Sequence, residues 1–225
     1  MNLNLQINNL LKKFDSGNKL KIYKELEKIF NKNKNNNLLR YNLAVIQQKL
    51  NMNTEAKTNY NYLIKLEKNI KSMINLYNIY FIEEKYYDAL NLINDILEIQ
   101  TFENIHKDKA FAYLKLNNIQ ASKEICAHYL TKNNKDTVCL NILGQCFFAE
   151  ENYSEAIKIF EHILTLDPKN LSALNSLGRI YHEKRNTEKA EKFFLDALKI
   201  NDLSFHVINN IAGFYREEGK NDKAT

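Results

Sequence analysis

The sequence contains no tryptophan, one proline and only five glycines among its 225 residues. Because proline and glycine concentrate in turns, their scarcity argues against a loop-rich or all-β fold. No apolar stretch approaches the roughly 18 residues that a membrane-spanning helix requires, so we expect no membrane span. The N-terminal segment MNLNLQINNLLKKF lacks the continuous apolar run of a signal peptide.

Cysteine is also scarce, and its three copies, Cys126, Cys139 and Cys146, cannot form an even disulfide framework. Cys139 and Cys146 lie two turns apart on one expected helix, roughly 10 Å along its axis, which is too far for a disulfide bond. We therefore expect buried free thiols in a reducing compartment. The sequence predicts a soluble cytoplasmic protein.

The motifs of common catalytic sites are missing. There is no glycine-rich phosphate loop, no paired-cysteine zinc spacing and no nucleophile elbow. None of the histidines has the HExxH type of spacing; they are His106, His128, His162, His182 and His206. We therefore expect no catalytic residue, no metal ion and no cofactor, and the protein is not expected to be an enzyme.

The excess of positive charge is confined to the N-terminal part of the sequence and is not spread along the chain. The net charge is +5, but residues 1–50 hold 10 basic and 3 acidic side chains, and the remaining residues hold 22 and 24. Nucleic-acid-binding proteins carry a basic face, and this distribution does not indicate one. Neither nucleic acid nor a membrane is therefore expected as a partner.

What the sequence does contain is a repeat. Residues 137–204 consist of two consecutive copies of a 34-residue repeat unit. A fixed period of this length is typical of stacked-repeat proteins. The aligned pairs are Leu140 and Leu174, Leu143 and Leu177, Gly144 and Gly178, Phe147 and Tyr181, Ala156 and Ala190, Phe160 and Phe194.

Spacing within the unit predicts two helices. Apolar or small residues occupy positions 4, 7, 8 and 11, and again 20, 24, 27 and 30, which are two helical stripes. A polar break separates the stripes, and Pro168 closes the first copy. Glycine inside a helix costs roughly 1 kcal/mol, so Gly144 and Gly178 at position 8 indicate a close crossing of the two helices.

These residues resemble the tetratricopeptide repeat, whose motif has leucine-glycine at 7 and 8, tyrosine at 11, alanine at 20, an aromatic residue at 24 and proline at 32. The sequence departs from the family at Leu140 and Leu174, where tryptophan is favoured, at Ile163, where alanine is favoured, and at Asp202, where proline is favoured. The resemblance implies helix pairs stacked into a right-handed α-solenoid.

Running the period in both directions extends the array. We expect an all-α fold, a single right-handed superhelix over residues 1–225 with about six and a half helix pairs. The copies begin near residues 3, 37, 70, 103, 137 and 171, and an incomplete one begins at 205.

The seventh copy stops at position 21, so we expect either a piece of a longer protein or an unusual natural end. We expect Ile208, Ile211 and Tyr215 to pack near Phe194, and 220–225 to be frayed. Phe214 would then lie in an exposed apolar patch that favours self-association.

By the resemblance, the first helices line a concave groove that binds partner peptides or helices. The groove residues expected here are Asn75, Asn78, Lys107, Asn141, Gln145, Asn175, Arg179, His182, His206, Asn209 and Arg216. The amides of Asn141, Asn175 and Asn209, all at position 5, could bind a peptide backbone. The alternative, which the pattern leaves open, is ordinary polar surface in an asparagine-rich chain.

The leading functional hypothesis is a protein-interaction scaffold. A carboxylate clamp of the kind that grips chaperone C-termini is disfavoured, because Lys107 at position 5 is followed by Phe111 at position 9. The alternative is the substrate-recruiting region of a larger glycosyltransferase- or sulfotransferase-type enzyme whose catalytic domain lies beyond residue 225. Asn42, Asn75 and Asn210 match the asparagine ladder of such regions, but Asp108, Ile142 and Ser176 do not.

Overall fold

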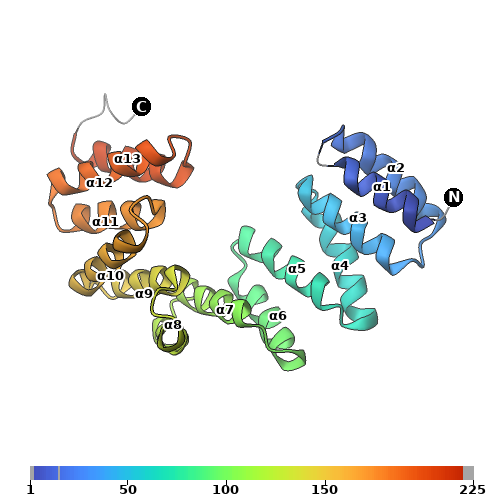
Figure 1. Ribbon diagram of the computed structural model, residues 1–225, viewed down its shortest axis with the longest axis horizontal. Helices are drawn as coiled ribbons and strands as arrows, with labels where there is room; N and C mark the ends of the chain where they lie inside the picture. Colours follow the sequence, from blue (N-terminus) through green and yellow to red (C-terminus); the bar gives the residue numbers. More distant parts are fainter. Residues whose placement is uncertain (1–2, 15, 220–225) are drawn as a thin grey trace. The chain divides into compact units, whose positions relative to one another are not determined.

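The computed structural model describes residues 3–14 and 16–219, which form thirteen α-helices and no strand (Figure 1). Residues 1–102 and 103–225 form two compact units. The first contains α1 (Leu3–Phe14), α2 (Lys19–Lys32), α3 (Asn37–Lys49), α4 (Asn53–Glu67), α5 (Ile70–Ile82) and α6 (Tyr86–Ile99). The second contains α7 (Glu103–Lys115), α8 (Ile119–Lys132), α9 (Thr137–Ala149), α10 (Tyr153–Leu166), α11 (Leu171–Glu183), α12 (Thr187–Ile200) and α13 (Phe205–Glu217).

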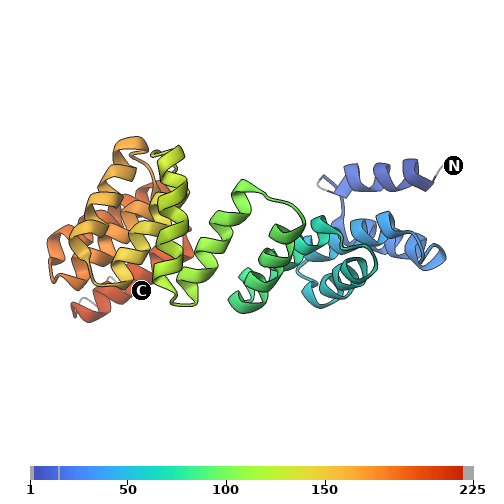
Figure 2. The same ribbon diagram turned by 90° about the horizontal axis from the view of Figure 1, so that it is seen from below.

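Every odd-numbered helix begins at the first residue of an expected copy, from Leu3 in α1 to Phe205 in α13. The all-α repeat fold is thus confirmed. Within each unit, successive helices lie side by side (Figure 2). That the two units form one continuous right-handed superhelix stays a prediction.

Asparagine caps most of the helices, which gives this abundant residue a structural use. An Asn side chain accepts a hydrogen bond from a first-turn backbone N–H at seven helix starts. These are Asn18, Asn36, Asn69, Asn118, Asn152, Asn170 and Asn186. Asp136 does the same for α9. Such a cap stabilises a helix by about 0.5–2 kcal/mol, so these residues fix where the repeats begin.

The turn inside the five full repeats that begin at residues 37, 70, 103, 137 and 171 has one backbone shape. At position 15 the backbone is left-handed, with φ between 55° and 60° at Asn51, Glu84, Asn117, Glu151 and Arg185. In the seventh copy the same position is Gly219, with φ of 71°. Left-handed geometry costs a residue other than glycine about 1–2 kcal/mol, so these turns are locally strained wherever the residue is neither glycine nor asparagine.

The small residue at position 8 does let the helices approach closely. A Cβ built on Gly144 would lie 2.7 Å from Cζ of Phe160, and one built on Gly178 would lie 2.7 Å from Cδ1 and Cε1 of Phe194. Both phenylalanines are buried in the largest core cluster of the second unit. The rings fill the space that the missing side chains leave.

Two positions of the first helices are more uniformly buried than the sequence indicated. From α3 to α11, each of these helices packs on the second helix of its own repeat and on a neighbouring repeat, and α13 packs on α11 and α12, so the apolar face of each is broad. Positions 3 and 10 are buried in all six copies from α3 to α13. These residues are Leu39, Ser72, Ile105, Cys139, Ala173 and Val207 at position 3, and Ile46, Ile79, Ala112, Cys146, Ile180 and Phe214 at position 10.

The expected packing of α13 is therefore partly wrong. Ile211 and Tyr215 join the core, but Ile208 is 40% exposed and Val207 is buried in its place. Phe214 is not in an exposed patch: only 1% of it is exposed, and its ring centroid lies 5.7 Å from that of Phe194. The segment expected to be frayed, 220–225, lies outside the described residues.

In the first unit an arginine takes a core position. Arg40 occupies position 4 of its copy, and its guanidinium carbon lies 3.9 Å from the ring centroid of Tyr62 and 4.8 Å from that of Phe30. Its two Nη atoms donate to Asn59 Oδ1 and to the Lys34 carbonyl, each at 3.0 Å. The flat guanidinium thus joins α2, α3 and α4.

The three cysteines are buried free thiols, as expected. Cys139 and Cys146 lie on α9 and Cys126 lies on α8, in one apolar cluster. The thiol of Cys146 donates to Ser122 Oγ at 3.3 Å, and that hydroxyl donates to the Ala110 carbonyl at 2.8 Å. The cluster holds α7, α8 and α9 together.

In the part of the chain that is described, no helix has the length and apolar character needed to cross a membrane.

Candidate functional site

The first helices of the second unit form a depression on their outward face. Its volume is about 520 Å³, and it is lined from four helices. Phe111 and Lys115 come from α7, Gln145 from α9, Asn175 and Arg179 from α11, and His206 from α13. These residues share positions 2, 5, 9 and 13 of their copies, so helix periodicity alone places them on one face.

A second depression of about 290 Å³ adjoins it and shares Phe111 and Ser172 with it. Lys107 and Asn141 line this second depression. Six of the eleven residues expected in a groove therefore come together here: Lys107, Asn141, Gln145, Asn175, Arg179 and His206.

The other five expected residues do not line these depressions. Asn209 and Arg216 are exposed on α13, and Asn78 is exposed on α5. His182 lies edge-on to Phe214, and its Nε2 is 3.3 Å from Glu217 Oε2. Asn75 donates from Nδ2 to the hydroxyl oxygens of two tyrosines, at 3.1 Å each, so its amide helps to hold the first unit together.

Two of the three position-5 asparagines, Asn141 and Asn175, already use half of their amide groups within the protein. Asn141 Oδ1 accepts a hydrogen bond from Ser172 Oγ at 2.9 Å, and Asn175 Oδ1 accepts one from Asn210 Nδ2 at 2.9 Å. Both bonds join consecutive repeats. The Nδ2 groups of Asn141 and Asn175 have no acceptor among the described residues, so each can donate to a ligand carbonyl.

Lys107 is tied to the protein itself. Its Nζ forms an ion pair with the carboxylate of Asp136, the residue that caps α9. The hydrogen bond to Asp136 raises the pKa of Lys107. For Asp136, burial by itself would raise the pKa, but the Lys107 ammonium and two backbone N–H groups outweigh it and the pKa is lowered. Both groups therefore stay charged near neutral pH.

Lys115 and Arg179 are placed differently. Arg179 Cζ lies 4.7 Å from the ring centroid of Phe148, and Lys115 Nζ lies 5.4 Å from that of Phe111. Neither forms an ion pair with a carboxylate of the described residues. Both cationic groups are thus oriented by aromatic rings and available to a ligand.

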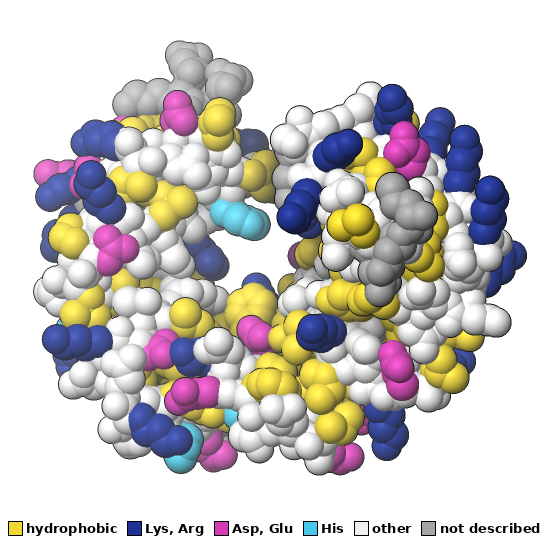
Figure 3. Space-filling view, turned by 45° about the vertical axis from the view of Figure 1, so that its right-hand side comes forward, with side chains coloured by type: hydrophobic (Ala, Val, Ile, Leu, Met, Phe, Trp, Pro, Cys, Tyr) yellow, Lys and Arg dark blue, Asp and Glu magenta, His cyan; other side chains and the backbone are white. Residues whose placement is uncertain are grey.

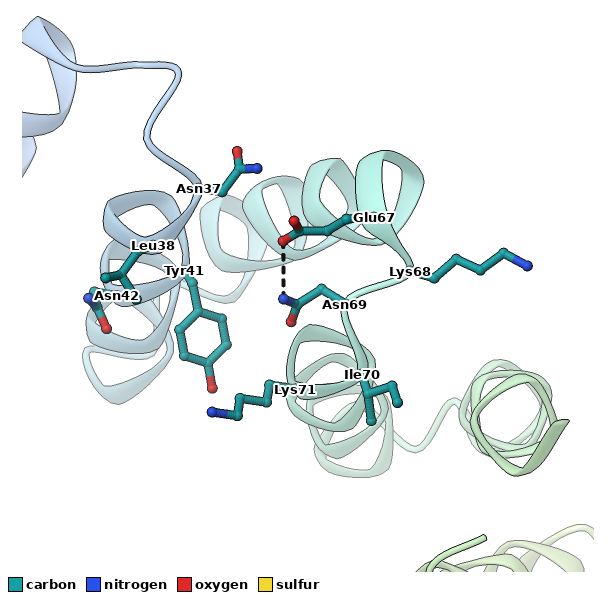
Figure 4. A pocket seen from close by; sticks show the side chains of 9 residues that line it. All are labelled: Asn37, Leu38, Tyr41, Asn42, Glu67, Lys68, Asn69, Ile70 and Lys71. Carbon is teal, nitrogen blue, oxygen red and sulfur yellow. Dashed lines mark hydrogen bonds between the residues drawn. The ribbon is translucent and has the colours of Figure 1, made fainter. Parts of the chain in front are cut away.

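The first unit has a larger depression, of about 810 Å³, which the sequence analysis missed (Figure 4). Leu38, Tyr41 and Asn42 of α3 line it together with the start of α5, and Tyr41 and Lys71 point toward one another. Glu67 Oε1 accepts a hydrogen bond from Asn69 Nδ2 at 3.2 Å at its edge. Leu38 and Lys71 stand at position 2 of their copies, and Tyr41 stands at position 5. The positions that predict groove residues in the later copies would therefore have identified these three residues as well.

The surface carries both signs of charge. On the face shown in Figure 3, lysine and arginine side chains are interspersed with acidic and uncharged ones. Among the described residues no group of histidine, cysteine, aspartate and glutamate side chains could hold a metal ion. What these surfaces offer is shape, amide donors and a few cations, which suits recognition of another chain.

A stack of helix pairs with depressions along its first helices is the architecture of a helical-repeat protein. Residues 136–202 match the family profile described as Tetratricopeptide repeat. The recognition of tetratricopeptide repeats is thus confirmed for that segment, and the solved structures with a similar fold are also tetratricopeptide repeat proteins.

One similar structure is a tetratricopeptide repeat protein from Parabacteroides merdae, with a TM-score of 0.87 and 17% identity over 97% of this chain and 87% of that one. PilF of Pseudomonas aeruginosa has a TM-score of 0.65 and 14% identity, covering 93% of this chain and 96% of that one. YrrB, titled as a TPR protein with an unusual peptide-binding site, has a TM-score of 0.55 and 20% identity, covering 82% and 96%. No curated protein matches the sequence. At these identities the structural similarity concerns the fold alone.

Proposed function

We propose that the chain is a protein-interaction scaffold that binds a peptide or helix of a partner protein along the first helices of its repeats. The observation that carries the proposal is the pair of adjoining depressions on α7, α9, α11 and α13. They hold polar groups whose hydrogen-bonding capacity the protein itself does not use. No catalytic role is proposed for any residue.

Two features support an extended segment as the ligand. Consecutive repeats place Asn141 and Asn175 at the same position, and the Nδ2 group of each has no acceptor among the described residues. A peptide backbone offers carbonyl groups at regular intervals, whatever its side chains are. YrrB, whose fold is similar, is described by its title as having a peptide-binding site.

The partner is thus proposed to be a protein or peptide rather than nucleic acid or a membrane, and the location to be cytoplasmic. The alternative role, as the recruiting region of a larger transferase, stays a prediction, because no feature of the described residues favours it.

A displayed library of random peptides, selected on the full chain, tests the proposal without knowledge of the partner. Peptides recovered on the unchanged protein should bind more weakly to a variant with Asn141→Ala and Asn175→Ala, the two position-5 asparagines that line the depressions. Each lost neutral hydrogen bond is worth about 0.5–1.5 kcal/mol, so a loss of about tenfold is expected. The matched control is Asn35→Ala with Asn134→Ala, two exposed asparagines outside the depressions.

Equal affinity for the groove variant and the unchanged protein, with helicity intact in both, would show that the asparagines are ordinary polar surface. Failure to recover any peptide that competes for a common site would contradict the scaffold proposal itself.

A further inference from the structure

The depression on α7, α9, α11 and α13 is lined by basic side chains and by no acidic one. Its twelve lining residues include Lys115, Arg179 and His206 and no carboxylate. Elsewhere in the molecule comparable lysines are neutralised, as in the pairs of Lys57 with Glu83 and Lys123 with Glu150. The positive charge of this depression is therefore not compensated within the described part of the chain.

Cations gathered in a concave surface reinforce one another. The low-dielectric walls of a hollow concentrate the field of its charges and attract the opposite charge from solution. Here the guanidinium of Arg179 lies over the ring of Phe148, and the ammonium of Lys115 lies near the ring of Phe111. An anionic group that enters meets oriented donors, so little side-chain entropy is lost on binding.

The uncharged lining completes an anion site beside an apolar floor. The Asn175 Nδ2 group is a donor without an acceptor among the described residues. Gln145 adds a second amide, and Leu171 and Phe111, both partly exposed, add apolar surface. A carboxylate can accept from a guanidinium and from amide donors together, which gives the stronger, charge-assisted type of hydrogen bond.

The neighbouring depression is different. It contains the Asp108 carboxylate, and its lysine, Lys107, is neutralised by Asp136. An anionic group is therefore favoured at Arg179 and not at Lys107. This difference defines where the anion binds.

We infer that the depression centred on Arg179 selects an acidic peptide segment, with an aspartate or glutamate side chain bound by Arg179 and Lys115 and an adjacent apolar side chain on Leu171 and Phe111. The inference rests on the proposed function and specifies the chemistry of the partner. The carboxylate comes from a side chain within the segment, since a segment running along several helices passes through the depression.

The test uses the same displayed random-peptide library, selected in parallel on the full chain and on its Arg179→Gln Lys115→Gln variant. Peptides recovered on the unchanged chain should be enriched in aspartate and glutamate next to apolar residues, and the variant should lose that enrichment. Lys192→Gln, which removes an exposed charge from α12 outside the depression, is the control and should keep it.

A recovered acidic peptide, labelled and capped at its C-terminus, then gives affinities. Arg179→Gln should weaken its binding about tenfold, the range for one lost charge-assisted hydrogen bond. Replacing its acidic residues by amides should have a similar effect, and both effects should shrink at high salt. A control peptide with an uncapped C-terminus should bind no more tightly; tighter binding would assign the carboxylate to a chain end and contradict the inference.

The remaining outcomes separate the inference from the proposed function. Recovered peptides without acidic bias that still depend on Asn141 and Asn175 would overturn the inference and leave the scaffold proposal standing. Recovery of no peptide sensitive to any groove variant would overturn both. A single-stranded oligonucleotide that displaces the acidic peptide and binds more tightly than it would also overturn the inference.

Discussion

Phe194 of α12 lies against the place where Gly178 of α11 lacks a side chain, with two ring carbons 2.7 Å from an ideal Cβ at that position. Both residues are in the core, and the same relationship joins Phe160 to Gly144 one repeat earlier. The distance between the two helices of a repeat is therefore set by a ring on one helix and a missing side chain on the other.

Gly178→Leu should separate α11 from α12 and lower the free energy of unfolding by about 1–3 kcal/mol or more, the usual range for overpacking a core. Gly213→Leu is the matched control, because nothing lies within 4 Å of a Cβ there and a leucine favours the helix. Denaturant titration measures both. Phe194→Leu should relieve part of the defect in the double variant. An unchanged midpoint for Gly178→Leu would refute the close crossing.

Glu151→Gly should stabilise the second unit by up to about 1 kcal/mol. Glu151 has a φ of 59°, and the relief of about 1–2 kcal/mol in left-handed strain exceeds the entropy cost of glycine, which is about 0.5–1 kcal/mol. Asn117→Gly, at the equivalent position, should have little effect because asparagine tolerates this geometry. Thermal denaturation compares the two. Destabilisation by Glu151→Gly would mean that its side chain contributes more than the strain costs.

The ion pair of Lys107 and Asp136 should stabilise the fold only within a window of pH. The folded pKa of Asp136 is lowered, so its contribution is present above about pH 4 and is lost as the pH falls through the folded value. The pKa of Lys107 is raised, so its contribution is present below about pH 10 and is lost as the pH rises through the folded value.

Asp136→Asn, which keeps the helix cap and removes the charge, isolates the pair. The difference in unfolding free energy from the unchanged protein should be about 1.5–3 kcal/mol at neutral pH, the range for hydrogen bonds to charged groups. It should shrink toward both ends of the pH range. A difference independent of pH would show that the cap, and not the ion pair, is what the substitution disturbs.

The three thiols should react only when α8 and α9 open locally. All are buried, and the pKa of Cys146 is raised by burial. The interaction between the thiols of Cys126 and Cys139, together with burial, raises the pKa of Cys126; the same interaction lowers the pKa of Cys139, against the opposite effect of burial. Low denaturant should accelerate modification by an aromatic disulfide reagent, since the thiolate forms mainly in open states. Ser154→Cys, at an exposed position of α10, is the control and should react without a delay. Equally fast reaction of the native thiols would contradict their burial.

Much of the fold could be predicted because the sequence of each repeat unit determines its local structure. The starts of α9 and α11 follow from the 34-residue period, from Gly144 and Gly178, and from the polar residues that cap the helices. These signals act over one or two helical turns, where propensity and capping determine the conformation. The less regular copies, which begin near residues 3, 37, 70 and 103, follow from continuing the repeat period toward the N-terminus.

The candidate site could be predicted only in part. Asn175 at position 5 and Arg179 at position 9 both line a depression, because the face of a helix follows from its period. The sequence could not show that Lys107 is neutralised by Asp136, 29 residues away, or that Asn75 bonds two tyrosines. Those contacts depend on side chains from different helices.

By itself, then, the sequence determined the helices, their order and the face that each one turns outward, since these depend on interactions between residues that are close along the chain. Only the tertiary structure decided which polar side chains on that face form hydrogen bonds or ion pairs within the protein and which are available to a ligand. It also decided that Phe214 and not Ile208 is buried. The physical reason is that each first helix packs against neighbours on two sides, and the breadth of its buried face is fixed by those neighbours and not by its own period.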